Sequence, residues 1–429
     1  MSREMKDSGV EWIGEIPEEW DVKRIKHAVA QMGSGTTPNS DNSNFYDGDI
    51  AWIQSGDLYN TPIITKTSRT VTKQAIQRCS ALKIYHKPYI VIAMYGASVG
   101  NVSIASIDAC TNQACCIVKP NDNNNIDYLK YWLEVCKTDF IRKSVGGGQP
   151  NISKNKVREQ TYLCPSPTEQ QQIVHFLDRK CTAIDTAIEK TKKSIEKLEE
   201  YKKAVITKAV TKGIDPNAKM KDSGVEWIGE IPEGWKVTKT KYLFRILKRI
   251  AGREGFDVIS ITQKGLKIKD ITSNEGQVAE NYSNYQFVFP GDFAMNHMDL
   301  LTGWVDLSAF TGVTSPDYRV FHKINESVNN DYYKYVFQSL YFNKVYYGLA
   351  QGVAEVGRKR LQAPAFKELK LPCPSADEQA KIAAYIKNKC MAIDALIEKK
   401  QTAINKWEEY KKSLIYYAVT GKIDLVEMK

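Results

Sequence analysis

The segment MKDSGVEWIGEIPEEW at residues 5–20 returns at residues 220–235 as MKDSGVEWIGEIPEGW, with a single substitution. A second segment, residues 165–185, returns in recognisable form 209 positions later, at residues 374–394. The chain is therefore a tandem duplication in which conserved and variable segments alternate twice, and a repeat of this size determines the architecture. Near-identical segments should bind the same partner twice, whereas the dissimilar middle regions should bind two different targets.

The bulk composition favours a folded protein. At 429 residues the chain has room for two or three domains, and 42% of its residues are hydrophobic. The net charge of +10 suits nucleic acid or an acidic membrane surface, although many basic proteins bind neither. The sequence shows no apolar signal segment and no apolar run near the ~20 residues that span a bilayer. Its nine scattered cysteines include no CxxC pair, so we expect reduced, mostly buried thiols in a cytoplasmic protein.

Two segments have the periodicity of a long helix with a single apolar stripe. Residues 169–210 place apolar side chains at spacings of three, four and seven, with Glu and Lys between them. The pattern is close to a coiled-coil seam, and a helix of ~42 residues would be roughly 60 Å long. Thr168 or Asp377 is the expected N-cap of its helix. The stripe positions are Ile173, Leu177, Ile184, Ile188, Ile195, Leu198, Val205 and Ala209, then Ile382, Ile386, Ile393, Ile397, Ile404, Trp407, Leu414 and Ala418.

A lone helix with one apolar stripe is unstable in water, so the two helices should pack on each other. The sequence leaves a parallel and an antiparallel pair open. We expect the antiparallel pair, because two bulky variable domains attached at adjacent helix starts would crowd each other. This arrangement would relate the two halves by a pseudo-two-fold axis.

The variable regions have an α+β pattern, with short apolar runs that predict strands and one aromatic helix each. The predicted fold class is α+β, with two mixed α/β domains separated by two long antiparallel coiled-coil helices. The strands are expected at residues 89–94, 114–118, 257–261 and 286–289, and the helices at residues 127–134 and 331–338. The predicted segments are a conserved start at 1–20, a variable domain at 21–164, a long helix at 165–212, a linker with the repeated start at 213–235, a second variable domain at 236–373 and a second long helix at 374–429.

The sequence lacks the common catalytic motifs. The phosphate-loop pattern GxxxxGK[ST] does not occur, nor does the Asn-Pro-Pro-aromatic loop of a DNA methyltransferase. A nuclease-like Pro316-Asp317 pair is not followed by the carboxylate that metal binding would need before Lys323. Asp57 and Asp299 are isolated acids of the kind that cap loops. We therefore expect a binding protein that has no catalytic residues and no metal site.

The combined motifs resemble those of type I restriction–modification specificity subunits. They are SGVEWIGEIPEEW near the N-terminus, Gly-Thr-Thr-Pro at residues 35–38 with WIQSGD at 52–57, GGGQPNIS at 146–153, and Pro-x-x-x-Glu-Gln before each long helix. The resemblance covers essentially the whole chain, in the order of a full-length subunit with two target-recognition domains. The second domain departs from it, because residues 351–357 read QGVAEVG in place of the GGGQPN turn.

The resemblance implies a DNA-reading subunit without catalysis of its own. It would bring two copies of an adenine methyltransferase subunit, and optionally two ATP-dependent restriction subunits, to a bipartite site on double-stranded DNA, with no role for a membrane. S-adenosylmethionine, ATP and Mg would bind the partner subunits, and this chain would hold no cofactor. Two unlike domains would read two unlike half-sites, with a spacing set by the protein's geometry.

Basic and amide side chains of the variable domains are the candidates for DNA contacts. Arg and Lys suit guanine edges or phosphates, whereas Asn and Gln suit adenine. Any one of these residues is most simply a solvated surface charge, but phosphate contacts need several cations together, which favours clusters. The candidates are Gln54, Lys66, Arg69, Lys73, Arg78, Asn151, Lys154, Lys156 and Arg158 in the first domain, and Arg253, Lys264, Lys267, Lys269, Arg358, Lys359 and Arg360 in the second.

The duplicated segments at 5–20 and 220–235, here called the lead segments, offer a second candidate surface. Their apolar side chains either dock a partner or pack internally against the far end of the helix pair, and internal packing is the favoured interpretation. The Glu/Lys run at residues 196–203 is most simply a solvated coiled-coil face, with partner contacts as the alternative. The lead-segment candidates are Trp12, Ile13, Pro17 and Trp20, with their equivalents Trp227, Ile228, Pro232 and Trp235.

A coiled-coil scaffold whose variable domains bind protein partners is the alternative function. It explains the helices and the repeat equally well, but it does not explain the basic clusters. A steep loss of DNA affinity with rising salt would separate the two functions, because phosphate contacts release counterions.

Overall fold

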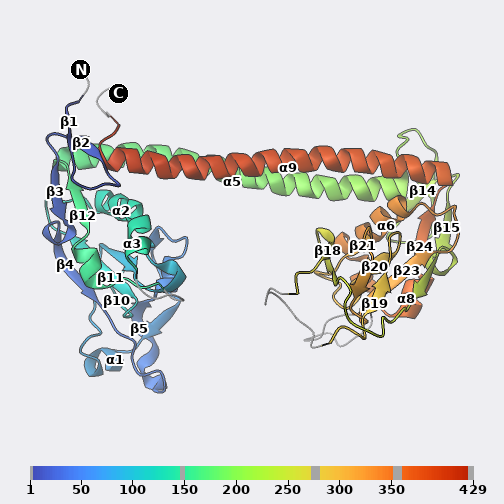
Figure 1. The fold of residues 1–429 in the computed structure, drawn as a ribbon, viewed down its shortest axis with the longest axis horizontal. Coiled ribbons are helices and arrows are strands. Elements are labelled where there is room, and N and C mark those ends of the chain that lie inside the picture. Colours follow the sequence, from blue (N-terminus) through green and yellow to red (C-terminus); the bar gives the residue numbers. More distant parts are fainter. Residues whose placement is uncertain (1–2, 145–149, 272–280, 351–359, 424–429) are drawn as a thin grey trace. The chain divides into compact units, whose positions relative to one another are not determined.

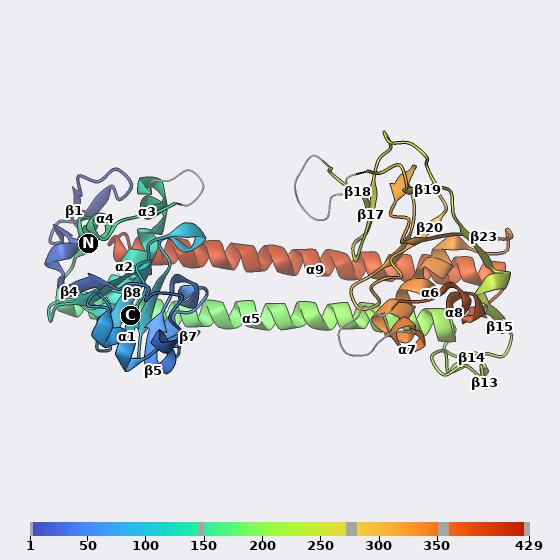
Figure 2. The same ribbon diagram turned by 90° about the horizontal axis from the view of Figure 1, so that it is seen from below.

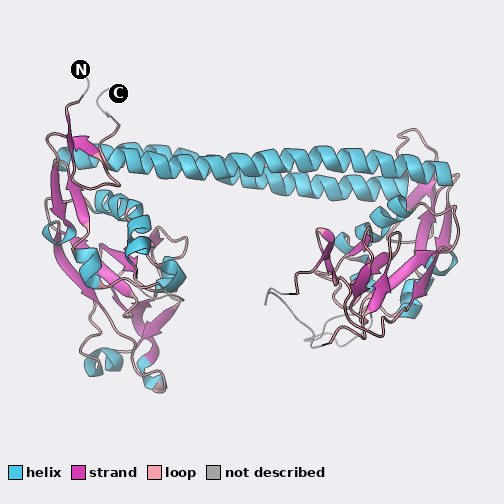
Figure 3. Ribbon diagram, viewed as in Figure 1, coloured by secondary structure: helices cyan, strands magenta, loops and turns pink. Residues whose placement is uncertain are grey.

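The chain folds as two compact units that each combine helices and strands (Figure 3). Unit 1 comprises Met1–Lys190 with Thr402–Lys429, and unit 2 comprises Thr191–Gln401. The computed structural model describes residues 3–144, 150–271, 281–350 and 360–423. None of the helices in those ranges combines the length and the apolar character that a bilayer span requires.

The main sheet of unit 1 has five strands (Figure 1). Their order is β4 (Val29–Ser34), β11 (Cys115–Pro120), β8 (Tyr89–Ala93), β9 (Val102–Ala105) and β6 (Ile63–Ile64). Neighbouring strands are antiparallel except β6 and β9, which are parallel. Strand β8 reads YIVIA with every residue buried, because it lies in the middle of the sheet and is covered on both faces.

Smaller elements complete unit 1. A second sheet has the order β10 (Ala109–Thr111), β5 (Tyr46–Ile53) and β7 (Arg69–Val71). Two strand pairs are β1 (Met5–Asp7) with β2 (Glu15–Pro17), and β3 (Asp21–Arg24) with β12 (Thr161–Cys164). The short helices are η1 (Ile25–His27), η2 (Ser43–Phe45), η3 (Ser55–Leu58), α1 (Lys73–Arg78), η4 (Gly96–Ser98), α2 (Ile126–Val135), α3 (Lys137–Lys143) and α4 (Lys154–Arg158).

Unit 2 is built around a four-stranded sheet in the order β16 (Phe244–Leu247), β23 (Arg319–Lys323), β20 (Phe293–Met295) and β21 (Val305–Leu307). The strand pairs are β13 (Met220–Asp222) with β14 (Glu230–Pro232), β15 (Lys236–Lys239) with β24 (Lys370–Cys373), β17 (Ile259–Thr262) with β18 (Gly265–Ile268), and β19 (Gln286–Val288) with β22 (Gly312–Thr314). The short helices are η5 (Thr240–Tyr242), α6 (Asn330–Phe342), α7 (Val345–Leu349) and α8 (Ala363–Glu368).

The two variable regions share one fold. The order β4-β11-β8-β9 in unit 1 is repeated as β16-β23-β20-β21 in unit 2, and both sheets are followed by an aromatic helix, α2 or α6. Both units also pair the strand after the lead segment with the strand before a long helix, as β3-β12 and β15-β24. The predicted α+β class of both variable regions, with one aromatic helix each, is confirmed.

The two long helices are α5 (Pro167–Lys212) and α9 (Ala376–Val419), and each unit contains half of both. In unit 1 the Tyr128 hydroxyl bonds the carbonyls of Leu163, just before α5, and Val419, at the end of α9. In unit 2 the Tyr332 hydroxyl bonds the Val210 carbonyl near the end of α5, and its neighbour Tyr333 bonds the Pro372 carbonyl just before α9. The helices are therefore antiparallel in each unit, as predicted (Figures 1 and 2).

Equivalent ion pairs join the helices in each unit. Lys411 Nζ lies 2.7 Å from Asp185 Oδ2 in unit 1, and Lys202 Nζ lies 2.7 Å from Asp394 Oδ1 in unit 2. Both lysines and both aspartates are 209 positions apart, so the two pairs are copies of one contact. Their side chains are a third to a half exposed, and such pairs contribute at most about 1 kcal/mol each.

The apolar stripe is buried at most of its predicted positions, with one clear error. Trp407 is 41% exposed, whereas Ile404 and Leu414 on the same helix are 2% and 6% exposed. An indole is too large to fit between close-packed helices, so Trp407 turns outward and lies against Tyr410, with ring centroids 6.1 Å apart. In the first copy Ile206 is buried and the predicted Val205 is only half-buried.

The helix starts also differ from the prediction. Neither Thr168 nor Asp377 is the N-cap, because α5 begins at Pro167 and α9 at Ala376. The Ser166 hydroxyl accepts from the Glu169 N–H at 3.3 Å, and the Ser375 hydroxyl accepts from the Glu378 N–H at 3.4 Å. Each serine therefore caps the third residue of its helix, and proline is well tolerated at the first position of α5.

A buried glutamine attaches each variable domain to its long helix. The side-chain oxygen of Gln170 accepts from the Asn125 N–H at 2.8 Å, and its amide donates to the Pro165 carbonyl at 3.0 Å. In unit 2 Gln379 makes the same two bonds, from the Asn329 N–H at 2.8 Å and to the Pro374 carbonyl at 2.9 Å. Both glutamines are at most 2% exposed. They explain why Glu-Gln recurs at the start of each long helix.

The nine cysteines are free thiols, and six of them are buried, as expected for a protein with reduced cysteines. Burial raises the pKa of the Cys110 thiol to about 12, so it stays protonated at neutral pH. These cysteines therefore behave as small apolar core residues.

Gln170→Leu should lower the free energy of unfolding by about 1–3 kcal/mol, because it removes the partner of the half-buried Asn125 N–H and of the buried Pro165 carbonyl. Urea unfolding of the full chain, followed by circular dichroism, measures this loss. Gln171→Leu is the matched control, since Gln171 is exposed on the same turn of α5. Equal effects of the two substitutions would contradict the role assigned to Gln170.

Candidate nucleic-acid interface

The lead segments pack inside their own units. In unit 1 the Trp20 indole N–H donates to Glu169 Oε2 at 2.9 Å, and Trp12 lies against Trp132 with ring centroids 5.9 Å apart. The Tyr416 hydroxyl on α9 donates to the Trp12 carbonyl at 2.9 Å. These contacts tie the lead segment to the long helices of its own unit. Six of the eight candidates are buried, namely Ile13, Pro17, Trp20, Ile228, Pro232 and Trp235, and Trp12 and Trp227 are half-buried.

Asp57 joins two candidate segments of unit 1. One of its carboxylate oxygens accepts from the Gln54 N–H at 2.8 Å, and the other accepts from the Ser68 N–H at 3.0 Å. These bonds hold Gln54, which follows β5, beside the turn that leads to Arg69. Asp57 is thus a capping acid, as its sequence context predicts.

Two buried aromatic rings fix the position of Arg69. Its guanidinium carbon lies 4.7 Å from the ring centroid of Tyr46 and 6.0 Å from that of Trp52. Both rings belong to β5 and are 8% and 2% exposed, while Arg69 itself is exposed at the start of the adjacent strand β7. An arginine held on aromatic faces loses less side-chain freedom on binding than a free one. Arg69 is therefore the best-ordered cation among the unit 1 candidates.

The remaining candidates of this region surround Arg69. Lys66 is exposed in the turn between β6 and β7, and Lys73 and Arg78 are exposed on α1, which contacts β5. The Thr72 hydroxyl caps α1 by accepting from the Ala75 N–H at 3.3 Å. The structure thus brings Gln54, Lys66, Arg69, Lys73 and Arg78 together around one small sheet.

A second group of candidates begins at Asn151 and continues into helix α4. Asn151 is exposed and forms a backbone bridge with Tyr95, which is 41% exposed. The hydroxyl of Ser153 caps α4, which carries Lys154, Lys156 and Arg158. Lys156 donates to the Lys143 carbonyl, whereas Lys154 and Arg158 are exposed. Residues 146–149 of the GGGQPNIS motif lie outside the described residues.

In unit 2 three lysine candidates share one hairpin. Lys264 is at the turn between β17 and β18, Lys267 lies on β18 opposite Ser260, and the Lys269 N–H donates to the Val258 carbonyl at 2.7 Å. Arg253 belongs to the preceding loop, where its guanidinium carbon lies 5.2 Å from the ring centroid of Phe256. The hairpin and the cluster around Arg69 are therefore both groups of exposed cations, although their structures differ.

Arg360 is separate from that hairpin and lies near a buried basic region. Its neighbour Leu361 accepts a hydrogen bond from Arg319 Nη2 at 2.8 Å and donates one to the His297 carbonyl at 3.1 Å. Burial, and then the positive charges of Arg319 and Arg360, lower the pKa of His297 to about 4. The candidates Arg358 and Lys359 lie outside the described residues.

A pH-dependent stability follows for unit 2. His297 binds a proton near pH 6.5 when unfolded but only near pH 4 when folded, so the unfolded chain gains protons first as the pH falls. Its contribution to stability is complete above pH 6.5 and is lost towards pH 4. His297→Gln should therefore reduce the fall in thermal unfolding temperature between these pH values, relative to the unsubstituted chain. Parallel pH profiles would contradict the shifted pKa.

Sequence reasoning missed the aromatic pair that orders Arg69. Tyr46 and Trp52 are both in β5, but the strand is irregular between Tyr46 and Ile50, so simple alternation does not place the two rings on one face. Their contact with Arg69 depends on the pairing of β5 with β7, which no local pattern specifies.

Comparison with known proteins gives consistent relationships. A family model described as the type I restriction modification DNA specificity domain matches residues 17–200 and 232–406. The MjaIX specificity subunit of a type I restriction enzyme from Methanocaldococcus jannaschii is 32% identical over 241 residues, which are 54% of this chain and 54% of that protein. The MjaVIII specificity subunit from the same organism is 24% identical over 426 residues, covering 95% of this chain and 94% of that protein.

Solved structures show the same fold. A chain from a structural study of type I R-M system assembly and conformational transition superposes with a TM-score of 0.68 at 11% identity, over 95% of this chain and 99% of that chain. The HsdS subunit from Thermoanaerobacter tengcongensis gives a TM-score of 0.50 at 13% identity, over 95% and 98% of the two chains.

Proposed function

This chain belongs to the type I restriction-modification DNA specificity family, and we propose that it selects a two-part sequence on double-stranded DNA. Each unit reads one half-site through its variable domain. The observation that carries this proposal is the repeated sheet order, β4-β11-β8-β9 and β16-β23-β20-β21, with unlike loops and unlike exposed cations around it. Two domains with the same sheet and different surface loops can bind two different targets of the same chemical class.

The cation clusters support duplex DNA as that class. In unit 1 the cluster around Arg69 combines exposed cations with the amide of Gln54, so it offers both phosphate contacts and an adenine-reading group. In unit 2 the β17–β18 hairpin projects Lys264 and Lys267 into solvent. A two-stranded ribbon of this kind fits the major groove of B-form DNA.

The conserved parts support a partner that binds twice. The half-exposed ion pairs of Lys411 with Asp185 and of Lys202 with Asp394 are the same in both units. Identical surfaces bind identical partners, so two methyltransferase subunits dock on this chain, one to each unit, and two restriction subunits join the complex in the same way. The chain itself has no catalytic role.

Cofactors belong to those partners in this proposal. Methyl transfer needs S-adenosylmethionine, and ATP-dependent restriction needs ATP and Mg, which the methyltransferase and restriction subunits bind. This chain contributes sequence selection and position. Its own side chains bind DNA and partner protein and take no part in the chemistry.

Methylation mapping tests the proposal. Cells that carry this chain and its methyltransferase subunit should show modified adenines in a motif of two defined parts around an unspecified gap. Exchange of residues 21–164 for the variable domain of a relative should change one part of the motif and leave the other intact. A continuous motif, or a motif that does not depend on this chain, would rule the proposal out.

Arg69→Gln should lower the affinity of the assembled methyltransferase complex for its DNA site by about 1–3 kcal/mol, because an ordered DNA contact is lost. Fluorescence anisotropy with a labelled duplex, repeated at several salt concentrations, measures the affinity and its salt dependence. Lys23→Gln is the control, since Lys23 is also exposed but pairs with Asp21 at 2.9 Å. Unchanged affinity in the Arg69 variant, or an affinity of the unsubstituted complex that does not fall with salt, favours the scaffold alternative.

A further inference from the structure

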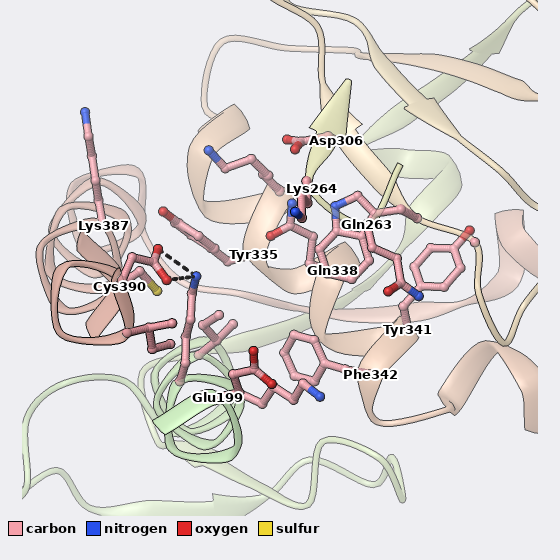
Figure 4. A pocket seen from close by; sticks show the side chains of 18 of the residues that line it. Glu199, Gln263, Lys264, Asp306, Tyr335, Gln338, Tyr341, Phe342, Lys387 and Cys390 are labelled. Atoms are coloured by element: carbon pink, nitrogen blue, oxygen red, sulfur yellow. Dashed lines mark hydrogen bonds and ion pairs between the residues drawn. The ribbon is translucent and has the colours of Figure 1, made fainter. Parts of the chain in front are cut away.

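Unit 2 contains a basic cavity that shares only Lys264 with the candidate DNA contacts. It has a volume of about 940 Å³ and lies between α6, the second half of α5 and the first half of α9 (Figure 4). Glu199 lines it from α5, Lys387 and Cys390 from α9, and Tyr335 and Gln338 from α6. We call it the lysine cavity, because its walls include Lys202, Lys203, Lys264, Lys334, Lys344 and Lys387.

Six lysines line the cavity against three carboxylates, those of Glu199, Asp306 and Asp394, so the lining keeps a net positive charge. Lys202 pairs with Asp394 at 2.7 Å, and Lys334 pairs with Asp331 at 3.4 Å. The other four lysines are exposed, and within the described part of the chain none of them has a carboxylate within ion-pair distance. Four such cations around one concave surface attract an anionic group.

The cavity also has an apolar component. Leu301 and Met391 line it and are each 61% exposed, which is unusually high for large apolar side chains. The walls also include Trp304 and Phe342, which are half-buried. A DNA backbone is uniformly charged and hydrated, so it would not cover these groups. An acidic protein segment with an apolar side chain would satisfy both the cations and the exposed leucine and methionine.

The equivalent position in unit 1 has the opposite charge. At the offset of 209, Lys387 corresponds to Asp178 and Met391 to Thr182, and in the aligned helices α6 and α2 Gln338 corresponds to Glu134. A lysine replaced by aspartate changes the charge by two and a glutamine replaced by glutamate changes it by one, so unit 1 is more negative by three at these two positions.

In unit 1 the carboxylates at this position bond to neighbouring side chains. The Tyr131 hydroxyl donates to Asp178 Oδ1 at 2.7 Å, and Lys130 pairs with Glu134 at 2.8 Å. These contacts use the carboxylates that unit 2 lacks. The duplicated scaffold is therefore not symmetric in charge, although its helix pairing is.

We propose that the lysine cavity binds an acidic segment, with at least one apolar side chain, of a methyltransferase subunit, and that the equivalent surface of unit 1 does not. This inference rests on the proposed function, in which two such subunits dock on the chain. One copy then gains charge contacts that the other lacks. The two copies differ in affinity, and the difference shrinks as salt screens the lysines.

Zero-length crosslinking tests the contact. The full chain is purified in complex with its methyltransferase subunit and treated with a carbodiimide, which joins lysine amines directly to carboxylates, and crosslinked peptides are identified by mass spectrometry. Lys203, Lys344 and Lys387 should crosslink to aspartates or glutamates of the partner, whereas Lys264 is left out because it also belongs to the β17–β18 hairpin. Lys412 is the internal control, because it is the exposed unit 1 equivalent of Lys203 and should not crosslink.

Exchange of residues between the units tests the asymmetry. Lys387→Asp combined with Met391→Thr gives unit 2 the residues of unit 1, and should weaken one copy of the partner about tenfold in native mass spectrometry across a salt series. Lys387→Gln is a milder variant that should weaken it less. Lys381→Asp is the charge control, since Lys381 is exposed on α9 outside the cavity. Thermal unfolding of each variant verifies the fold.

Each result has a defined meaning. Lysines that are shielded from acetylation by duplex DNA but not by the partner would assign the cavity to DNA and overturn the inference. Crosslinks that appear equally at Lys412 would overturn the asymmetry. A complex that methylates a two-part site normally and is unaffected by the exchanged residues refutes the cavity's role but leaves the proposed function intact. A chain that forms no complex and directs no methylation refutes both.

Discussion

Two buried glutamines hold the architecture together. Gln170 and Gln379 each accept a hydrogen bond from the N-cap residue of a variable-domain helix and donate one to the backbone before a long helix. A polar side chain with almost no exposed surface is tolerated only when its bonds are satisfied, so these contacts fix the geometry of the attachment. The loops of a variable domain can therefore differ without any change in how the domain is attached to the long helices.

The attachment through Gln170 and Gln379 belongs to the part of the structure that is repeated in both units, and the candidate DNA contacts belong to the part that differs. The lead segments, the glutamines and the helix ion pairs form a frame that is repeated almost residue for residue. The cations around Arg69 and on the β17–β18 hairpin belong to loops that differ between the units. Within this frame the two copies differ in charge at a few equivalent positions, such as Asp178 in the first copy and Lys387 in the second.

The repeat and the α+β class were predictable because each is visible in local sequence or in the duplication, whereas the antiparallel helix pair was expected from the crowding of two variable domains. The aromatic helices at Asp127 and Asp331 and the strand at residues 89–94 are examples, since their apolar residues are contiguous or periodic. The outward position of Trp407 was not predictable, because it depends on the space between two helices and not on periodicity. The serine caps were accessible in principle, since Ser166 precedes Glu169 by three residues, which is the capping-box spacing.

The sequence predicted which residues belong to the candidate site, but not how they are arranged in space. The basic residues of each domain could be named, but the ring contacts of Arg69 and the neighbours of Lys387 come from strand pairing and from helices that are far apart in the sequence. Long-range packing of this kind has no single-sequence signature. The lysine cavity combines residues from Glu199 to Ile397, and no window along the chain contains them together.

Unit 1 is assembled from both extremes of the polypeptide, whereas unit 2 is one continuous stretch. The Trp12 carbonyl receives its hydrogen bond from Tyr416, and the Tyr128 hydroxyl bonds the Val419 carbonyl. During translation the ribosome releases residues 191–401 before it completes those contacts. The second half of the duplication can thus finish folding first, and the first half waits, partly unfinished, for the last helix to emerge.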